Sequence, residues 1–176
     1  MINKHGIGII LSSLALTAAS VAWAPTAQAH TAQNCTGRED ITYGSGLGLS
    51  SETTTVTVDG IYRCTDGSGH TTTAKYRSTG TTPATCLLLA SNKATETLHF
   101  ADGSRTVIDY NSGTSLRILG LNTAKLHGVV VDGQGRGSVA EKIIQTVPTS
   151  LPTDCVLTGG IRHTIAFTHL SIRPNP

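Results

Sequence analysis

Histidine is the residue type in this chain best suited to metal binding, and four histidines lie in segments that resemble β-strands. His163 and His169 occur in "GIRHTIAFTHLSI", and their spacing of six places them on one face of a strand. Six residues of strand span about 20 Å, which is too far for both to bind one ion. Each would need partners from neighbouring strands, such as His99 or His127. We interpret these histidines as isolated surface side chains and expect no metal site.

Two carboxylates in the middle of apparent strands, Asp109 in "VIDY" and Glu141 in "VAEKI", are the next candidates for chemistry. Paired carboxylates can hydrolyse glycosides, but such sites need a cleft and usually aromatic subsites. The alternation around both residues places them on the solvent face. The chain also lacks the G-x-S-x-G and C-x-x-C motifs that position a nucleophilic serine or a reactive thiol. We therefore predict no catalytic residue and no cofactor, and favour a binding protein over an enzyme.

The stretch "VVVDGQGRGSVAEKII" (Val129–Ile144) places glycines at 133, 135 and 137 and raises the question of a phosphate-binding loop. Such a loop needs the spacing G-x-G-x-x-G or a G-K-[ST] ending, followed by a helix. Neither pattern is present, and the segment after the glycines ends in β-branched residues before Pro148. The "DG" pair is typical of a β-hairpin. We predict a hairpin here.

Four cysteines, Cys35, Cys64, Cys86 and Cys155, remain after the amino-terminal segment. An even number in an exported chain indicates two disulfides, although three pairings are possible in principle. Cys35 and Cys64 flank an apparent hairpin and would lie opposite each other if Tyr43 pairs with Val56. We prefer the pairs Cys35–Cys64 and Cys86–Cys155.

The elements that would carry these residues are short alternating segments separated by Gly, Pro, Asn and Asp turns, with no sustained helical period. "TTTVTVDGIYRC" places Val56, Val58, Gly60, Tyr62 and Cys64 on one face. "CLLLA" from Cys86 resembles a strand buried on both faces. About nine strands are expected. We predict an antiparallel β-sandwich, in which two packed sheets cover the apolar faces, with a closed β-barrel as the alternative.

Residues 1–29 have the order of a secretory signal peptide: a weakly basic start, the apolar run "IGIILSSLALTAASVA", and small residues ending at Ala29. We expect cleavage after Ala29, a secreted domain from 30 to 176, and no membrane anchor in the mature chain. Removing Lys4 leaves 12 basic and 11 acidic residues. This balance gives no indication of nucleic-acid binding.

Several short motifs together resemble a group of small exported all-β proteins of actinobacteria. They are "CTG" at Cys35, a following Tyr and Gly-Leu, Cys64 and Cys86, "DGS" at Asp102, the "G-x-V…G-x-G" hairpin, and "C-x-x-x-G-G" from Cys155. The group has no established activity. The resemblance therefore implies export and fold, and it supplies no catalytic residues.

Three functions are compatible with these features. We favour a secreted, non-enzymatic protein that binds an extracellular protein, an envelope component such as a glycan, or a small ligand through its surface. A secreted hydrolase assembled from distant loops is the alternative, and a pocket with mutually hydrogen-bonded titratable groups would favour it. The Pro-rich segment "TVPTSLPTDC" (Thr146–Cys155) would suit a protease inhibitor.

Overall fold

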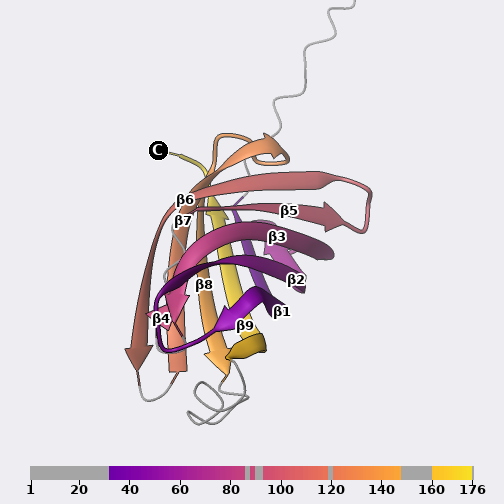
Figure 1. The fold of residues 1–176 in the computed structure, drawn as a ribbon. Coiled ribbons are helices and arrows are strands. Elements are labelled where there is room, and N and C mark those ends of the chain that lie inside the picture. The colour runs from indigo at the N-terminus through magenta and orange to yellow at the C-terminus, as the bar shows by residue number, and fades with distance from the viewer. Residues whose placement is uncertain (1–31, 86–87, 90–92, 119–120, 148–159, 176) are drawn as a thin grey trace, which may run out of the picture.

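The computed structural model describes residues 32–85, 88–89, 93–118, 121–147 and 160–175, and the regular structure in these residues is entirely β-strand (Figure 1). The strands in chain order are β1 (Gln33–Leu47), β2 (Glu52–Asp66), β3 (Thr71–Thr85), β4 (Leu88–Leu89), β5 (Ala94–Phe100), β6 (Arg105–Ile118), β7 (Leu121–Gly133), β8 (Val139–Val147) and β9 (Ile161–Arg173).

Eight of these strands form a closed antiparallel barrel. Each pairs with the next long strand along the chain, and β9 pairs with β1 to complete the ring, while the two-residue β4 pairs only with the end of β3. The predicted sandwich is therefore wrong, and the barrel alternative is confirmed. Alternating apolar and polar residues produce one buried face in either architecture, so the pattern does not reveal whether the first and last strands pair. Closure leaves none of the eight strands with an unpaired edge.

Alternate residues of each strand point into the barrel, as the burial of Cys35, Glu39, Ile41 and Tyr43 between exposed neighbours in β1 illustrates. The end of the barrel where β1 begins and β9 ends is filled by a large cluster of buried side chains. This cluster contains Cys35, Tyr62, Cys64, Ala74, Tyr76, Leu98, Phe100, Ile108, Tyr110, Leu126, Val130, Ala140, Leu170 and Ile172. The opposite end, where β1 ends and β2 begins, has a smaller cluster of Ile41, Tyr43, Leu47, Ala84 and Ala166.

A disulfide joins Cys35 of β1 to Cys64 of β2 inside the filled end. The two cysteines lie directly opposite each other in the β1–β2 ladder, in the same register that pairs Tyr43 with Val56. The predicted pair is thus confirmed, and so is the hairpin register from which it was inferred. The second predicted pair, Cys86–Cys155, lies outside the described residues and stays a prediction.

The Gly-rich stretch forms the hairpin between β7 and β8, as predicted. Gly133, Gly135 and Gly137 have φ of 81°, 74° and 88°, a region that glycine adopts without steric penalty. The Gly137 N–H donates to the Val130 carbonyl at 2.8 Å, and the Val130 N–H donates to the Ser138 carbonyl at 2.9 Å. Strand β8 follows directly, so there is no helix N-terminus at which a phosphate could bind.

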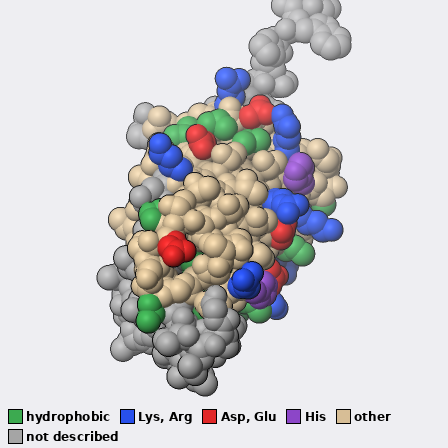
Figure 2. All heavy atoms as spheres, in the orientation of Figure 1, with side chains coloured by type: hydrophobic (Ala, Val, Ile, Leu, Met, Phe, Trp, Pro, Cys, Tyr) green, Lys and Arg blue, Asp and Glu red, His purple; other side chains and the backbone are tan. Residues whose placement is uncertain are grey.

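The face seen in Figure 2 is mainly polar, with positive and negative side chains interspersed on it. The larger apolar side chains on the outside are Leu49, Ile61, Val129, Val131, Val139 and Phe167. Within the described part of the chain, no helix has the length and apolar character needed to cross a membrane.

Candidate functional site

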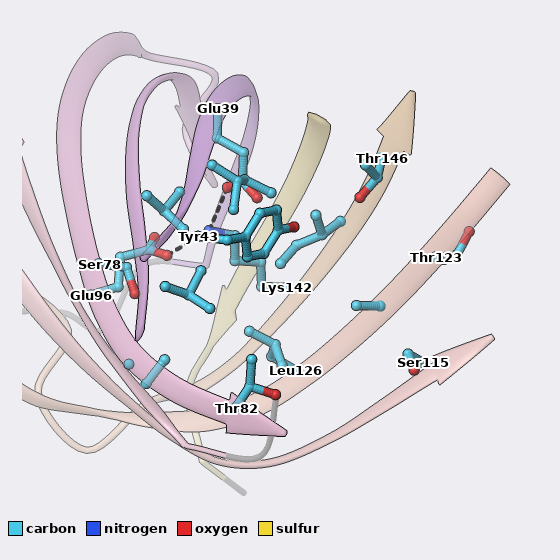
Figure 3. Close-up of a pocket in the computed structure, with 17 residues that line it drawn as sticks. Glu39, Tyr43, Ser78, Thr82, Glu96, Ser115, Thr123, Leu126, Lys142 and Thr146 are labelled. Carbon is cyan, nitrogen blue, oxygen red and sulfur yellow. Dashed lines mark hydrogen bonds and ion pairs between the residues drawn. The ribbon is translucent and has the colours of Figure 1, made fainter. Parts of the chain in front are cut away.

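Among the described residues, three charged side chains lie inside the barrel: Glu39 of β1, Glu96 of β5 and Lys142 of β8, each at most 1% exposed. The Lys142 Nζ lies 2.8 Å from Oε2 of Glu39 and 2.7 Å from Oε2 of Glu96 (Figure 3). Buried charges persist in proteins when they are paired and hydrogen-bonded. The ammonium group therefore holds the two carboxylates together. We call these three residues the charged cluster.

Strand periodicity turns each member of the charged cluster inward. Side chains two positions apart in a strand lie on the same face, and each charged residue has a buried apolar residue at that spacing. These apolar neighbours are Ile41 in β1, Leu98 in β5 and Ala140 in β8.

Tyr76 of β3 reaches across β2 to contact the charged cluster. Its hydroxyl donates a hydrogen bond to Glu39 Oε2 at 2.7 Å. Gly60 lies between the two residues in the sheet, because it pairs with Glu39 on one side and with Tyr76 on the other. A Cβ at position 60 would lie 2.4 Å from Tyr76 Cζ. The missing side chain of Gly60 thus provides the space in which the Tyr76 ring lies.

Aromatic rings cover the ammonium group on one side. Tyr62 and Tyr76 stack with centroids 4.2 Å apart, and Lys142 Nζ lies 4.6 Å from the Tyr76 centroid and 5.7 Å from that of Tyr62. Both distances fall in the range in which a ring face attracts a cation. The Lys142 ammonium is consequently stabilised by ring faces as well as by carboxylates.

Burial and charge act in opposite directions on the protonation of the cluster. Burial raises the pKa of Glu96 above its ordinary value, although the nearby Lys142 opposes the shift. Burial alone would lower the pKa of Lys142, but attraction to Glu39 and Glu96 outweighs it and raises that pKa well above the ordinary value. Lys142 therefore stays protonated, while Glu96 holds its proton to higher pH than a solvent-exposed glutamate does.

Several buried polar atoms have no hydrogen-bond partner among the described residues. They include Oε1 of Glu39, Oε1 of Glu96 and the hydroxyl of Tyr43. A buried polar group without a partner is costly and calls for an explanation, such as a bound ligand or water. These three atoms belong to residues that line the same cavity.

The cavity occupies the half of the barrel that the large apolar cluster leaves open. The cavity volume is about 80 Å³, and the cavity opens to solvent. Its wall is mostly apolar, and Figure 3 shows Ser115, Thr123 and Thr146 near the strand ends, away from the charged cluster. The apolar side chains of the wall are Ile41, Val56, Val58, Ala94, Ala124, Leu126 and Ile144.

The residues that the sequence suggested for chemistry lie on the outside of the barrel. Asp109 is exposed and accepts a hydrogen bond from the Thr95 hydroxyl. Glu141 Oε2 pairs with Lys125 Nζ at 3.0 Å. Their predicted solvent-facing position is confirmed. The four histidines are surface residues as well: His99, His127, His163 and His169.

In the described residues, no three His, Cys, Asp or Glu side chains converge in a way that could hold a metal ion. Of the Pro-rich segment proposed for protease inhibition, only Thr146 and Val147 are described, at the end of β8. Its remaining residues and Cys86 lie outside the described part of the chain.

The charged cluster was missed in the sequence, although a signal for it was present. Glu141 was correctly placed on the solvent face, and the same alternation turns Lys142 inward. Glu39 lies on the same face of its strand as the buried Ile41, and Glu96 lies on the same face as the buried Leu98. A charged residue at a position where the alternation of the strand predicts an apolar, inward-facing residue is the pattern that would have identified the site.

Comparison of the sequence with protein-family models and with curated proteins finds no match to either. The function is therefore inferred from the geometry of the cavity.

Proposed function

We propose that this protein is a secreted, non-enzymatic binding protein that holds a small ligand inside its barrel. The observation that carries the proposal is the cavity, whose apolar wall ends at buried polar atoms without protein partners. Small-ligand sites commonly combine an apolar lining with a few converging polar groups. An eight-stranded barrel has an interior of the size that holds side chains or one small ligand.

Interior binding narrows the range of ligands that the sequence left open. Proteins and glycans would have to bind to the outer surface, where Val129 pairs with Val139 beside Val131 and the other exposed large apolar side chains lie on other parts of the barrel. The cavity instead admits a compact molecule with an apolar body and a polar end. The unpartnered atoms of Glu39, Glu96 and Tyr43 are the polar contacts that the cavity offers to such a molecule.

A variant that fills the cavity tests this proposal. Ala124 of β7 lines the cavity, whereas Val129 of the same strand is exposed on the outside. Ligand-observed NMR with indole, 1-hexanol and hexylamine should detect binding of at least one probe to the native protein and to Val129→Phe. The same probe should not bind to Ala124→Phe. Absence of binding to the native protein, or equal binding to both variants, would overturn the proposal.

Acid–base catalysis on a bound molecule is the second candidate, because the cavity contains mutually hydrogen-bonded titratable groups. Glu96, whose pKa is raised by burial, is the group best suited to donate a proton. Hydrolysis through a serine is less well supported. The serine hydroxyls of the described cavity wall, Ser78 and Ser115, form no hydrogen bond to a base within the described residues.

Activity screening separates the two candidates. Purified protein incubated with p-nitrophenyl esters, peptides and glycans should give no turnover if it only binds. Turnover that Glu96→Gln abolishes and Glu141→Gln preserves would replace the binding proposal with the catalytic one.

A further inference from the structure

The charged cluster uses only part of its hydrogen-bonding capacity. Lys142 contacts Oε2 of each glutamate, and Tyr76 also donates to Oε2 of Glu39. Oε1 of Glu39 and Oε1 of Glu96 remain without partners, although both side chains are fully buried. A carboxylate oxygen is an acceptor, so these two atoms require donors.

The charges of the cluster point to the same requirement. Two ionised carboxylates and one ammonium have a net charge of −1, and no second cation is found among the described residues that line the cavity. A buried excess charge is strongly unfavourable until it is neutralised by a proton or by a cation. The cluster therefore has to bind either a proton or a second cation.

Tyr43 provides an independent indication that a polar group binds here. It is 2% exposed, lines the cavity, and its hydroxyl has no partner among the described residues. A phenol can both donate and accept a hydrogen bond. Figure 3 shows this hydroxyl at the end of the ring that points away from Lys142 and Glu96, so Tyr43 offers a second polar contact further along the cavity.

The three ordinary head groups of small amphipathic molecules fit this site unequally. A carboxylate would add negative charge and leave the free oxygens of Glu39 and Glu96 unsatisfied. The single positive charge of Lys142 already faces two glutamates, so it would not offset the charge of a third carboxylate. A hydroxyl provides one donor and no charge, whereas an ammonium provides three donors and a positive charge.

Building on the binding function proposed above, we propose that the cavity is a site for a small primary amine. Its ammonium group would lie at the charged cluster, where Oε1 of Glu39 and Oε1 of Glu96 lack partners, and the Tyr43 hydroxyl would be a separate polar contact further along the cavity. Its aliphatic body would lie against the apolar wall formed by Val56, Val58 and Ile144. The side chain of Lys142, itself an ammonium on an aliphatic stem, already shows that these carboxylates hold such a group.

Binding of the amine should release a proton. Without ligand, burial favours the protonated form of Glu96, and a second cation would favour the ionised form. The titratable groups that face Glu96 are Lys142 of β8, Glu39 of β1, and Tyr62, Tyr76 and Tyr110 of β2, β3 and β6. All three tyrosines have pKa values raised by burial, so they stay neutral and do not supply this proton.

Isothermal titration calorimetry with hexylamine, 1-hexanol and hexanoate tests the proposal, because the three probes differ mainly in the head group. Hexylamine should bind about tenfold more tightly than 1-hexanol, as expected for hydrogen bonds to charged acceptors. Hexanoate should bind more weakly than either. Repeating the hexylamine titration in buffers with different ionisation enthalpies should reveal release of a proton.

Glu96→Gln keeps the size of the side chain and removes its charge. This variant should lose the preference for hexylamine while its affinity for 1-hexanol changes little. Glu141→Gln is the matched control, since Glu141 adjoins Lys142 in sequence but pairs with Lys125 on the outside. The control should keep the preference.

The outcomes separate this proposal from the broader one. If 1-hexanol or indole binds in the cavity as tightly as hexylamine, or hexanoate binds best, the amine proposal is overturned and the binding function stands. If neither these three probes nor indole binds, the amine proposal and the binding function are both overturned. Comparison of the probes on the native protein decides these points even if Glu96→Gln does not fold.

Discussion

Lys142 determines the properties of the interior, because it is the one described cation among the residues lining the cavity. Its ammonium group pairs with Glu39 and Glu96, and it lies against the rings of Tyr62 and Tyr76. Buried ion pairs often contribute little net stability, but removing one partner leaves an uncompensated charge. The role of Lys142 can therefore be read from single and combined substitutions.

Lys142→Met should lower the free energy of unfolding by about 3–5 kcal/mol, because two carboxylates would then face each other in the interior. Adding Glu39→Gln and Glu96→Gln to that variant should recover most of the loss, since no buried charge remains. Urea denaturation monitored by circular dichroism measures both values. Two results would contradict this account: Lys142→Met as stable as the native protein, or a triple variant that is no more stable than Lys142→Met alone.

Glu96 should make the native protein less stable as pH rises. Its pKa is raised by burial above the ordinary value of 4.5, so above about pH 4.5 the native state binds more protons than the unfolded state. The free energy of unfolding then falls with rising pH, by at most about 1.4 kcal/mol per pH unit, until the native pKa is passed. Glu96→Gln should lack this fall. The free energy of unfolding of the variant, relative to that of the native protein, should therefore increase as the pH rises above about 4.5.

Denaturation of both proteins across a pH series provides the measurement. Hydrogen bonds from Ser68, Ser104 and Lys125 lower the pKa values of Asp66, Asp102 and Glu141 and make stability rise with pH. These groups are the same in both proteins and cancel in the difference. A difference that is constant with pH would show that burial does not raise the pKa of Glu96.

At the scale of the strands, most of the predicted elements are confirmed. The register that pairs Cys35 with Cys64 follows from strand periodicity and the turn between the strands, both of which are local properties of the sequence. The charged cluster joins β1, β5 and β8, which are distant in sequence, so its assembly depends on the closure of the barrel. Inward-facing charges were predictable from periodicity, but their meeting at one point was not.

Gly60 links the strands to the cluster, because the Tyr76 ring lies over it to reach Glu39. Gly60→Ala should displace Tyr76 and lower the free energy of unfolding by about 1–3 kcal/mol, as overpacking commonly does. Gly48→Ala is the control, since a Cβ at position 48 would meet nothing within 4 Å. Equal stability of the two variants in thermal denaturation would show that Gly60 is not needed for the placement of Tyr76.

At the scale of the whole molecule, the two halves of the barrel are built differently. One half is packed with apolar side chains around the Cys35–Cys64 disulfide, while the other contains the cavity. Dense packing at one end lets the fold tolerate open space and buried charge at the other. The sequence indicated one apolar face for each strand but not how much of the enclosed volume those faces would fill.

Loss of the disulfide should weaken the whole fold, because the bond closes a loop between residues 29 apart in sequence. The chain-entropy relation gives about 3–4 kcal/mol for a loop of this length. Cys35→Ala with Cys64→Ala should show this loss in urea denaturation and keep the strand signal in circular dichroism. A change below about 1 kcal/mol would mean that packing alone holds this end together.

Methyl NMR of the protein titrated with hexylamine and 1-hexanol tests the central claim, that the interior is the binding site, most directly. Binding in the cavity predicts shifts at the methyl groups of Ile41, Val58 and Ile144, which line the interior. The methyl groups of Ile61 and Val131, which are exposed on the outside, should not shift. Shifts confined to these outer methyl groups, with the interior signals unchanged, would contradict the account and favour binding through the surface.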